Sequence, residues 1–146
     1  MTALDTNILI AANRPEYPNH SAARHAIHSR AEANEPWALP VFVIGEFLKV
    51  VTHPRAMAPP TPTEKALANI HSLLSSPTVR LLLPGERFWP LLAETCRDGD
   101  ARGNLVFDAQ IVALCREHGV REILTEDRGL RRFSGIKVTH LDARGA

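Results

Sequence analysis

Short apolar segments alternate along this chain with longer stretches of helical spacing, and this alternation limits the folds open to it. The segments with strand character are TAL, WAL, VRLLL, REILT and KVTHL. The helical patterns between them are NHSAARHAIHSRAEA, VFVIGEFLKVV, TEKALANIHSLLSS, RFWPLLAETC and NLVFDAQIVALCREHG. Strands separated by helices are typical of a parallel sheet covered by helices. We therefore expect an α/β fold with a central parallel sheet of about five short strands.

The length and composition fit one domain over residues 1–146. A chain of 146 residues can bury one core, and its 45% hydrophobic and 23% charged content is ordinary for a globular protein. The formal net charge of +1 favours neither a nucleic acid nor a membrane as partner. The apolar run Ile8 to Ala12 is too short for a membrane span. Cys96 and Cys115 are far apart in sequence, and we interpret them as reduced thiols of a cytoplasmic protein.

Two helices can be described in more detail from the sequence. Thr61, Pro62 and Glu64 have the spacing of a capping box with proline at the first helical position. The helix that stops at Gly119 has a predicted apolar face. That face consists of Val106, Phe107, Ile111, Leu114 and Cys115.

Four carboxylates stand where a parallel sheet would bring them to one edge. Asp5 follows the first strand directly, and Asp127 follows REILT after one residue. Glu46 is in the second turn of the helix after WALP, and Asp108 is in the first turn of a later helix. In open parallel sheets, ligands bind beyond the carboxyl ends of the strands. We therefore expect the four side chains to converge at that edge.

Each of these acids also has a purely structural explanation. Asp5 can cap the helix that follows it, and Glu46 can pair with Lys49 on a solvated face. Asp108 can complement the dipole of its helix, and Asp127 can cap the short turn RGLRRF. Because four separate explanations must hold at once, the conjunction favours one shared site.

A cluster of carboxylates needs something to balance its charge. Two carboxylates about 5 Å apart repel by roughly 3 kcal/mol at an effective dielectric constant of about 20. Such a site protonates or binds a cation. Ligands that are all oxygen atoms favour Mg²⁺ or Mn²⁺, and such an ion polarises a phosphoryl oxygen and activates a bound water. The sequence therefore indicates phosphate chemistry.

The same motifs, in this order, resemble the PIN domain family. They are LDTNIL, a glutamate in an apolar helix, GNLVFDAQIVALCREHG and ILTEDRGLRRF. The resemblance spans nearly the whole chain and is greatest to the VapC-type toxins of bacterial toxin–antitoxin pairs. It implies a single PIN-like domain and a metal-dependent endoribonuclease that uses Mg²⁺, with Mn²⁺ as a substitute.

The resemblance assigns roles to individual residues. Asp5, Glu46, Asp108 and Asp127 fall on the acidic positions of the family, as metal ligands and catalytic groups. Polar positions that support the site correspond to Asn7, Asn104 and Thr125. Glu126 lies inside the family's T-x-D element, in which Asp127 takes the acidic place, so Glu126 is either a helper or unrelated to the site.

Partners are implied by the same resemblance. They are an RNA substrate, a second copy of the chain in a homodimer, and a cognate VapB-like antitoxin, with no membrane. We expect the antitoxin's C-terminal segment to fold over the helices that contain ILIAA, SAARHAI and EKALANIHSLL. Arg102, Arg128 and Arg131 lie beside the acidic motifs, where both a solvated surface and contacts to RNA phosphates would explain them.

Other functions fit parts of the sequence. A non-toxin PIN nuclease that processes RNA, or a catalytically silent RNA-binding PIN module, would have the same fold. A phosphoaspartate hydrolase of the dehalogenase type is disfavoured because Asn7 stands where its second aspartate is needed. His20, His25 and His28 suggest a zinc site, but a solvated helix face explains them better. Trp89 is the aromatic residue that we expect to be exposed.

Overall fold

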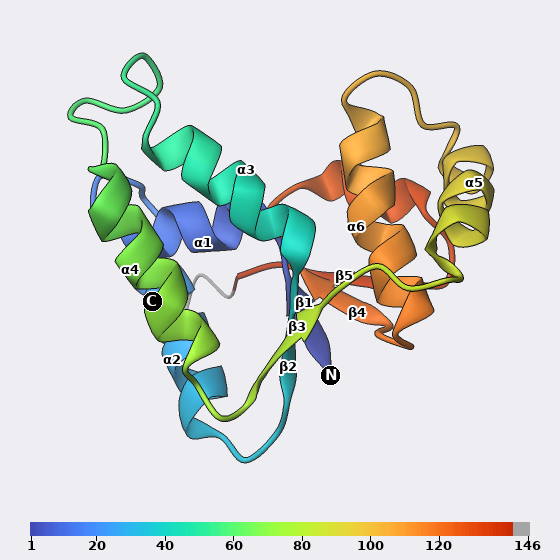
Figure 1. Ribbon diagram of the computed structural model, residues 1–146, viewed down its shortest axis with the longest axis horizontal. Helices are drawn as coiled ribbons and strands as arrows, with labels where there is room; N and C mark the ends of the chain where they lie inside the picture. Colours follow the sequence, from blue (N-terminus) through green and yellow to red (C-terminus); the bar gives the residue numbers. More distant parts are fainter. Residues whose placement is uncertain (142–146) are drawn as a thin grey trace.

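The computed structural model describes residues 1–141 and contains the expected parallel sheet. Its strands are β1 (Thr2–Leu4), β2 (Trp37–Pro40), β3 (Val79–Leu82), β4 (Glu122–Leu124) and β5 (Lys137–Thr139). They are hydrogen-bonded in the order β3-β2-β1-β4-β5, and every neighbouring pair is parallel (Figure 1). All five predicted strands are confirmed, and the last three are shorter than the sequence pattern predicts.

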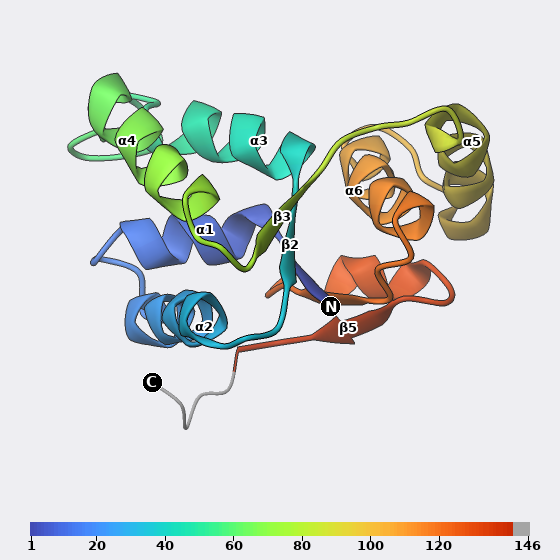
Figure 2. The ribbon, with the colours of Figure 1, turned by 60° about the horizontal axis from the view of Figure 1, so that its bottom comes forward.

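Helices cover the sheet as two groups. They are α1 (Thr6–Asn13), α2 (His20–Glu32), α3 (Val41–Val51), α4 (Thr63–Leu74), α5 (Phe88–Gly99) and α6 (Leu105–Glu117), with a 3₁₀ turn η1 (Arg128–Arg132). Figures 1 and 2 show α1 to α4 on one side of the sheet and α5 with α6 on the other. Both faces of the sheet are therefore buried, as expected for parallel strands. Within the described residues, no helix is long and apolar enough to cross a membrane.

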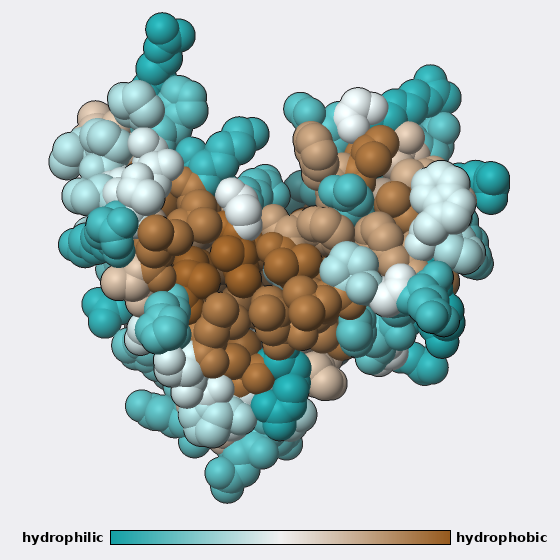
Figure 3. All heavy atoms as spheres, in the orientation of Figure 1, coloured by the Kyte–Doolittle hydropathy of each residue, from teal (hydrophilic) through white to brown (hydrophobic). Residues whose placement is uncertain are grey.

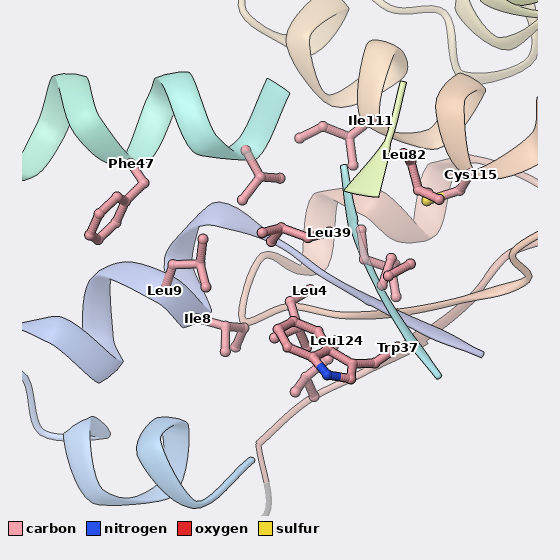
Figure 4. Close-up of a cluster of buried hydrophobic side chains, with 14 of the residues drawn as sticks. Leu4, Ile8, Leu9, Trp37, Leu39, Phe47, Leu82, Ile111, Cys115 and Leu124 are labelled. Atoms are coloured by element: carbon pink, nitrogen blue, oxygen red, sulfur yellow. The ribbon is translucent and has the colours of Figure 1, made fainter. Parts of the chain in front are cut away.

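The core lies between these two groups of helices and the central strands. Every residue of β2 is buried, and Trp37 is only 1% exposed, with its indole N–H donating to the Thr78 hydroxyl at 3.1 Å. Figure 4 shows side chains of α1, α3 and α6 meeting those of the strands. Cys115 is fully buried in this cluster, and burial raises the pKa of its thiol to about 12. The predicted role of Cys115 as a small core residue is confirmed.

The predicted capping box before α4 is wrong. Helix α4 begins at Thr63, with Pro62 as its N-cap and no side-chain capping bond. The hydroxyl of Thr61 is buried and instead accepts a hydrogen bond of 3.1 Å from the buried guanidinium of Arg14. A buried arginine needs partners for its donors, and this tertiary need outweighs the local capping motif.

Two further details differ from the sequence pattern. Phe107 was expected on the apolar face of α6 but is 59% exposed, whereas Ile111, one turn later, is 1% exposed. Helix α5 continues beyond Cys96 to Gly99, and the absence of a side chain on Gly99 lets the Phe133 ring pack directly against the helix backbone. Sequence periodicity does not reveal this contact between distant segments.

The strand register brings two polar segments together at the carboxyl edge of the sheet. Leu4 at the end of β1 is paired with Leu124 at the end of β4. The N–H of Asp5 then donates to the carbonyl of Leu124 at 3.0 Å. Because both strands end at this point, the residues that follow β1 face those that follow β4.

Candidate functional site

Asp5 is held at the end of β1 by hydrogen bonds to both of its carboxylate oxygens. Its Oδ1 accepts from the N–H of Thr6 at 2.7 Å, so Asp5 does cap α1. Its Oδ2 accepts from the Thr125 hydroxyl at 2.7 Å. The residue is only 5% exposed. The capping explanation is therefore correct, and it does not exclude a second role, because a carboxylate has about four lone-pair sites.

The Thr125 hydroxyl joins the two segments that leave the sheet. Besides donating to Asp5, it accepts from Nδ2 of Asn7 at 2.9 Å and from the N–H of Asp127 at 2.9 Å. Asn7 in turn accepts from the N–H of Glu126 at 3.0 Å through its Oδ1. Three hydrogen bonds thus fix the start of α1 against the turn after β4, and the fourth, from the N–H of Asp127, shapes the turn itself.

Asp127 and Glu126 point to different partners. Oδ1 of Asp127 accepts from the N–H of Gly129 at 2.8 Å and caps η1, as its structural explanation predicts. Oε1 of Glu126 accepts from the N–H of Leu141 at 2.7 Å. Glu126 therefore uses its carboxylate to hold the segment after β5, while Asp127 stays within the segment that Thr125 anchors.

Glu46 reaches the cluster from α3 through a residue that sequence reasoning missed. Its Oε2 accepts from the hydroxyl of Thr6 at 2.9 Å. Within residues 1–141, no ion pair joins Glu46 to Lys49, so the predicted surface pair is wrong. Thr6 lies between Asp5 and Asn7, and its place in DTN was the available signal. The sequence does not show that its side chain would face α3.

Asp108 is coupled electrostatically to the other three acids. Burial and then the charges of Asp127, Asp5 and Glu46 raise its pKa to about 6, and Arg132 partly opposes this. The pKa of Asp5 is raised as well, chiefly by burial. Hydrogen bonds from Thr125 and Thr6 lower the pKa of Asp5, whereas the charges of Glu46 and Asp127 raise it further. The four acids therefore share one electrostatic environment.

The donor chemistry fits a hard divalent cation, but the side chains do not yet form a closed coordination shell. All four acidic groups offer oxygen ligands, and their mutual repulsion favours a positive charge between them. Within the described residues, no three acidic, histidine or cysteine side chains are close enough together to hold one ion. An ion would thus have to draw these side chains closer.

The other predicted residues are not all brought to this cluster. Asn7 and Thr125 contact Asp5, but Asn104 is exposed at the start of α6 and makes no capping bond. Asn104 thus takes the N-cap position of α6 without a side-chain capping bond, and its role in supporting the site stays a prediction.

The three predicted RNA-binding arginines are all exposed. Arg102 pairs with Asp100 at 3.0 Å, and Arg131 contacts the His140 ring at 2.9 Å. Arg128 lies directly after Asp127 at the start of η1. All three side chains are therefore open to solvent, and their contact with RNA stays a prediction.

The histidines and exposed aromatic residues follow their structural explanations. Nδ1 of His20 contacts the carbonyl of Ala11 at 2.7 Å, and His25 and His28 are exposed on α2. Trp89 is 71% exposed, as predicted. None of these side chains lies in the network around Asp5.

Comparison with known proteins agrees with this arrangement. Residues 2–136 match the PIN domain family. The chain belongs to the PIN domain family. This PIN domain is 34% identical over 140 residues to Ribonuclease VapC43 of Mycobacterium tuberculosis, covering 96% of this chain and 95% of that protein. It is 35% identical over 135 residues to Ribonuclease VapC48 of the same species, covering 92% of each.

Solved structures share the fold of this PIN domain at lower sequence identity. VapBC2 from Rickettsia felis, bound to a DNA fragment from its promoter, matches with a TM-score of 0.71 and 15% identity over 97% of this chain and 98% of that one. VapC20 of M. tuberculosis, described as a sarcin–ricin loop cleaving toxin, matches with a TM-score of 0.60 and 17% identity over 84% and 87%.

Proposed function

We propose that this PIN domain is a metal-dependent endoribonuclease and the toxin of a toxin–antitoxin pair. The observation that carries the proposal is the arrangement at the carboxyl edge of the sheet, where the Thr125 hydroxyl bonds to Asp5 and to the N–H of Asp127 and the Thr6 hydroxyl bonds to Glu46. The charges of these three acids also raise the pKa of Asp108. Relatives at 34% and 35% identity over nearly the whole chain are named ribonucleases. A cluster of oxygen ligands suits a hydrolysis in which water attacks a phosphodiester directly.

The four acids would hold Mg²⁺, with Mn²⁺ as a substitute. When bound, such an ion polarises a phosphoryl oxygen and lowers the pKa of a bound water. Asp5 contributes a carboxylate whose position is fixed by Thr6 and Thr125. Glu46 is steered toward the cluster by the Thr6 hydroxyl. Fixed ligands of this kind reduce the reorganisation that the site needs when substrate arrives.

A pair of adjacent acids gives a sharp test of this activity. Asp127→Asn keeps an oxygen that can accept from Gly129 but removes a charge, and we expect it to abolish cleavage of RNA in Mg²⁺. Glu126→Gln is the matched control, because the Glu126 carboxylate serves Leu141 and an amide oxygen can still accept that bond. The assay uses protein freed of partners, with Mg²⁺, Mn²⁺ or EDTA.

Two outcomes would contradict the proposal. Equal loss of cleavage in both variants, with folding retained, would mean that total charge and not the Asp127 position matters. No cleavage by the unsubstituted protein in either metal would favour a catalytically silent RNA-binding module.

The proposed antitoxin has a groove of suitable character among the helices. Side chains of α1, α2, α3 and α4 line it, and apolar ones form much of it. The apolar lining includes Leu9, Ala12, Ile27, Phe47, Ile70 and Leu73. Polar side chains such as Arg24 and Asn69 also line it. An amphipathic segment can place its apolar face in such a groove, and an arginine from it could pair with the carboxylate cluster.

The groove can be tested with two leucines of one helix. Leu73→Glu changes the groove, whereas Leu67→Glu changes a leucine of α4 that is 43% exposed and does not line it. We expect the product of the neighbouring reading frame to copurify with the unsubstituted chain and with Leu67→Glu but not with Leu73→Glu. Equal binding by both variants would place the antitoxin elsewhere.

A homodimer would cover a hydrophobic face at one edge of the sheet. Leu81 and Leu83 are 39% and 53% exposed on and just after the edge strand β3. Figure 3 shows a broad hydrophobic area over β3 on this face of the molecule. Exposed apolar surface at a strand edge is typical of an association site. Light scattering should show a dimer that Leu83→Lys weakens, and a monomeric unsubstituted chain would refute this arrangement.

A further inference from the structure

A second hollow lies directly beside the acidic cluster, between α3 and α6. It is lined by Phe42, Gly45, Glu46 and Lys49 of α3 and by Phe107 and Gln110 of α6, among others. Glu46 belongs to both the hollow and the acidic cluster. Figures 1 and 3 show α3 and α6 on the two sides of a notch with hydrophobic residues at its base. Whatever occupies this hollow therefore contacts one of the four acids, Glu46.

Phe107 presents an aromatic ring next to one of those acids. It directly precedes Asp108 on α6 and is 59% exposed, although the helical pattern predicts it to be buried. Exposing a phenylalanine side chain rather than burying it costs about 2 kcal/mol in apolar area. Core packing does not account for this position, since Ile111, one turn later, is the buried residue.

The opposite wall of the hollow is fixed in place and leaves free space. The Phe42 ring on α3 packs against Phe88, with ring centroids 5.6 Å apart and planes tilted by 43°. Gly45, one turn later, is exposed, and a Cβ atom built on it would meet no other atom within 4 Å. The hollow thus has an aromatic wall on each helix and open space at a glycine.

The polar groups of the hollow are those that recognise a nucleotide. Lys49 brings an ammonium group that can neutralise a phosphate. Gln110 brings an amide with both a donor and an acceptor, which matches the edges of nucleobases. Base stacking on aromatic rings is the usual way in which proteins hold single-stranded RNA. A purely apolar ligand is disfavoured, because it would offer the Glu46 carboxylate no donor beyond the Thr6 hydroxyl.

From this combination we propose that the hollow is a nucleobase subsite for single-stranded RNA. The base of a nucleotide adjacent to the cleaved phosphate stacks on Phe107, with its edge toward Gln110 and its backbone toward Lys49. The inference rests on the proposed ribonuclease function and adds the part of the substrate that this face reads. Phe107 is thus assigned as a substrate-binding residue.

An abasic scan of a cleaved oligonucleotide tests this subsite. In the unsubstituted protein, removing one particular base beside the cleaved bond should lower kcat/KM by roughly tenfold, in line with the stacking of one base. Phe107→Ala should lower kcat/KM on the intact oligonucleotide by a similar factor. In this variant, removal of that base should cause no further fall in kcat/KM. Phe107→Tyr should retain the base dependence, whereas Phe107→Leu, which keeps apolar bulk without a π face, should lose it.

One control variant and a second variant of the hollow separate the subsite from general effects. Trp89→Ala removes an aromatic side chain that is 71% exposed and lies outside the hollow, and should leave the scan unchanged. Gly45→Leu fills the open space without burying a polar group, and should also remove the base dependence. Circular dichroism melts check that both hollow variants fold, which is expected because Phe107 and Gly45 are exposed.

Three results would overturn the inference. If Phe107→Ala still cleaves RNA and shows the same base dependence as the unsubstituted protein, the subsite is refuted but the proposed ribonuclease function is not. A change in oligomeric state with an unchanged scan would identify the hollow as a contact between protein chains. No cleavage by the unsubstituted protein with Mg²⁺ or Mn²⁺ would remove the proposed function, and the subsite with it.

Discussion

Neutralising Asp108 should stabilise the protein when no divalent ion is present. Its pKa is raised from 3.8 to about 6, first by burial and then by the charges of Asp127, Asp5 and Glu46. A raised carboxyl pKa means that the folded state disfavours the ionised form. The folded protein therefore loses stability as the pH rises from about 4 through 6, and Asp108→Asn should be free of this loss.

The magnitude follows from the same pKa values. A change from 3.8 to about 6 corresponds to about 3 kcal/mol for a fully shielded group. Asp108 is only half-buried, so solvent screening reduces this to about 1–2 kcal/mol. For a chain of this size, that gain corresponds to a rise in Tm of about 5 °C at pH 7. The difference between variant and unsubstituted protein should shrink toward zero at pH 4.

Thermal melts in EDTA at pH 4, 5, 6 and 7 measure this effect. Asp98→Asn is a control of opposite sign, because hydrogen bonds from Arg116 and Ser134 lower the pKa of Asp98. That variant should lose stability at pH 7. If Asp108→Asn melts at the same temperature as the unsubstituted protein at pH 7, or lower, then neither burial nor the neighbouring carboxylates destabilise the Asp108 charge.

Three further predictions concern single side chains. Glu46→Gln should reduce RNA cleavage by orders of magnitude while changing the free energy of unfolding by less than about 1 kcal/mol, and a chain with full activity would remove it from the site. Thr125→Val should destabilise the protein by about 2–4 kcal/mol in denaturant titrations, because it removes the short bond to Oδ2 of the buried Asp5 carboxylate; an unchanged midpoint would contradict this. Gly99→Ala should lower Tm, because its methyl group would collide with the Phe133 ring, and a Tm equal to that of the unsubstituted chain would show that the ring moves aside.

The architecture was predictable because each element carries its own signal. The apolar strands and the amphipathic helices are local patterns, and the position of Asp5 directly after β1 follows from topology alone. Parallel strands bring Asp5 and the segment of Asp127 to one edge of the sheet, and the helices α3 and α6 carry Glu46 and Asp108. The order of the acidic motifs along the chain led separately to the PIN family.

The details that the sequence did not reveal depend on contacts between distant segments. The Thr61 hydroxyl serves Arg14, from 47 residues away, and not the helix that follows it. The Thr6 hydroxyl turns to Glu46 on α3, 40 residues further along the chain. Helical periodicity placed Phe107 in the core, but this side chain is exposed. Periodicity alone cannot show which part of a helix face is covered by a neighbouring helix.

The Thr125 hydroxyl has no hydrogen-bonding capacity left. A threonine hydroxyl can donate once and accept twice, and here it donates to Asp5 and accepts from Asn7 and from the N–H of Asp127. It is therefore saturated, and neither a water nor a substrate group can bind it without displacing one of these partners. Thr125 therefore links the segment after β4 to the start of α1 and has no role left for a further ligand. A water in the proposed reaction would therefore have to bind to groups other than the Thr125 hydroxyl.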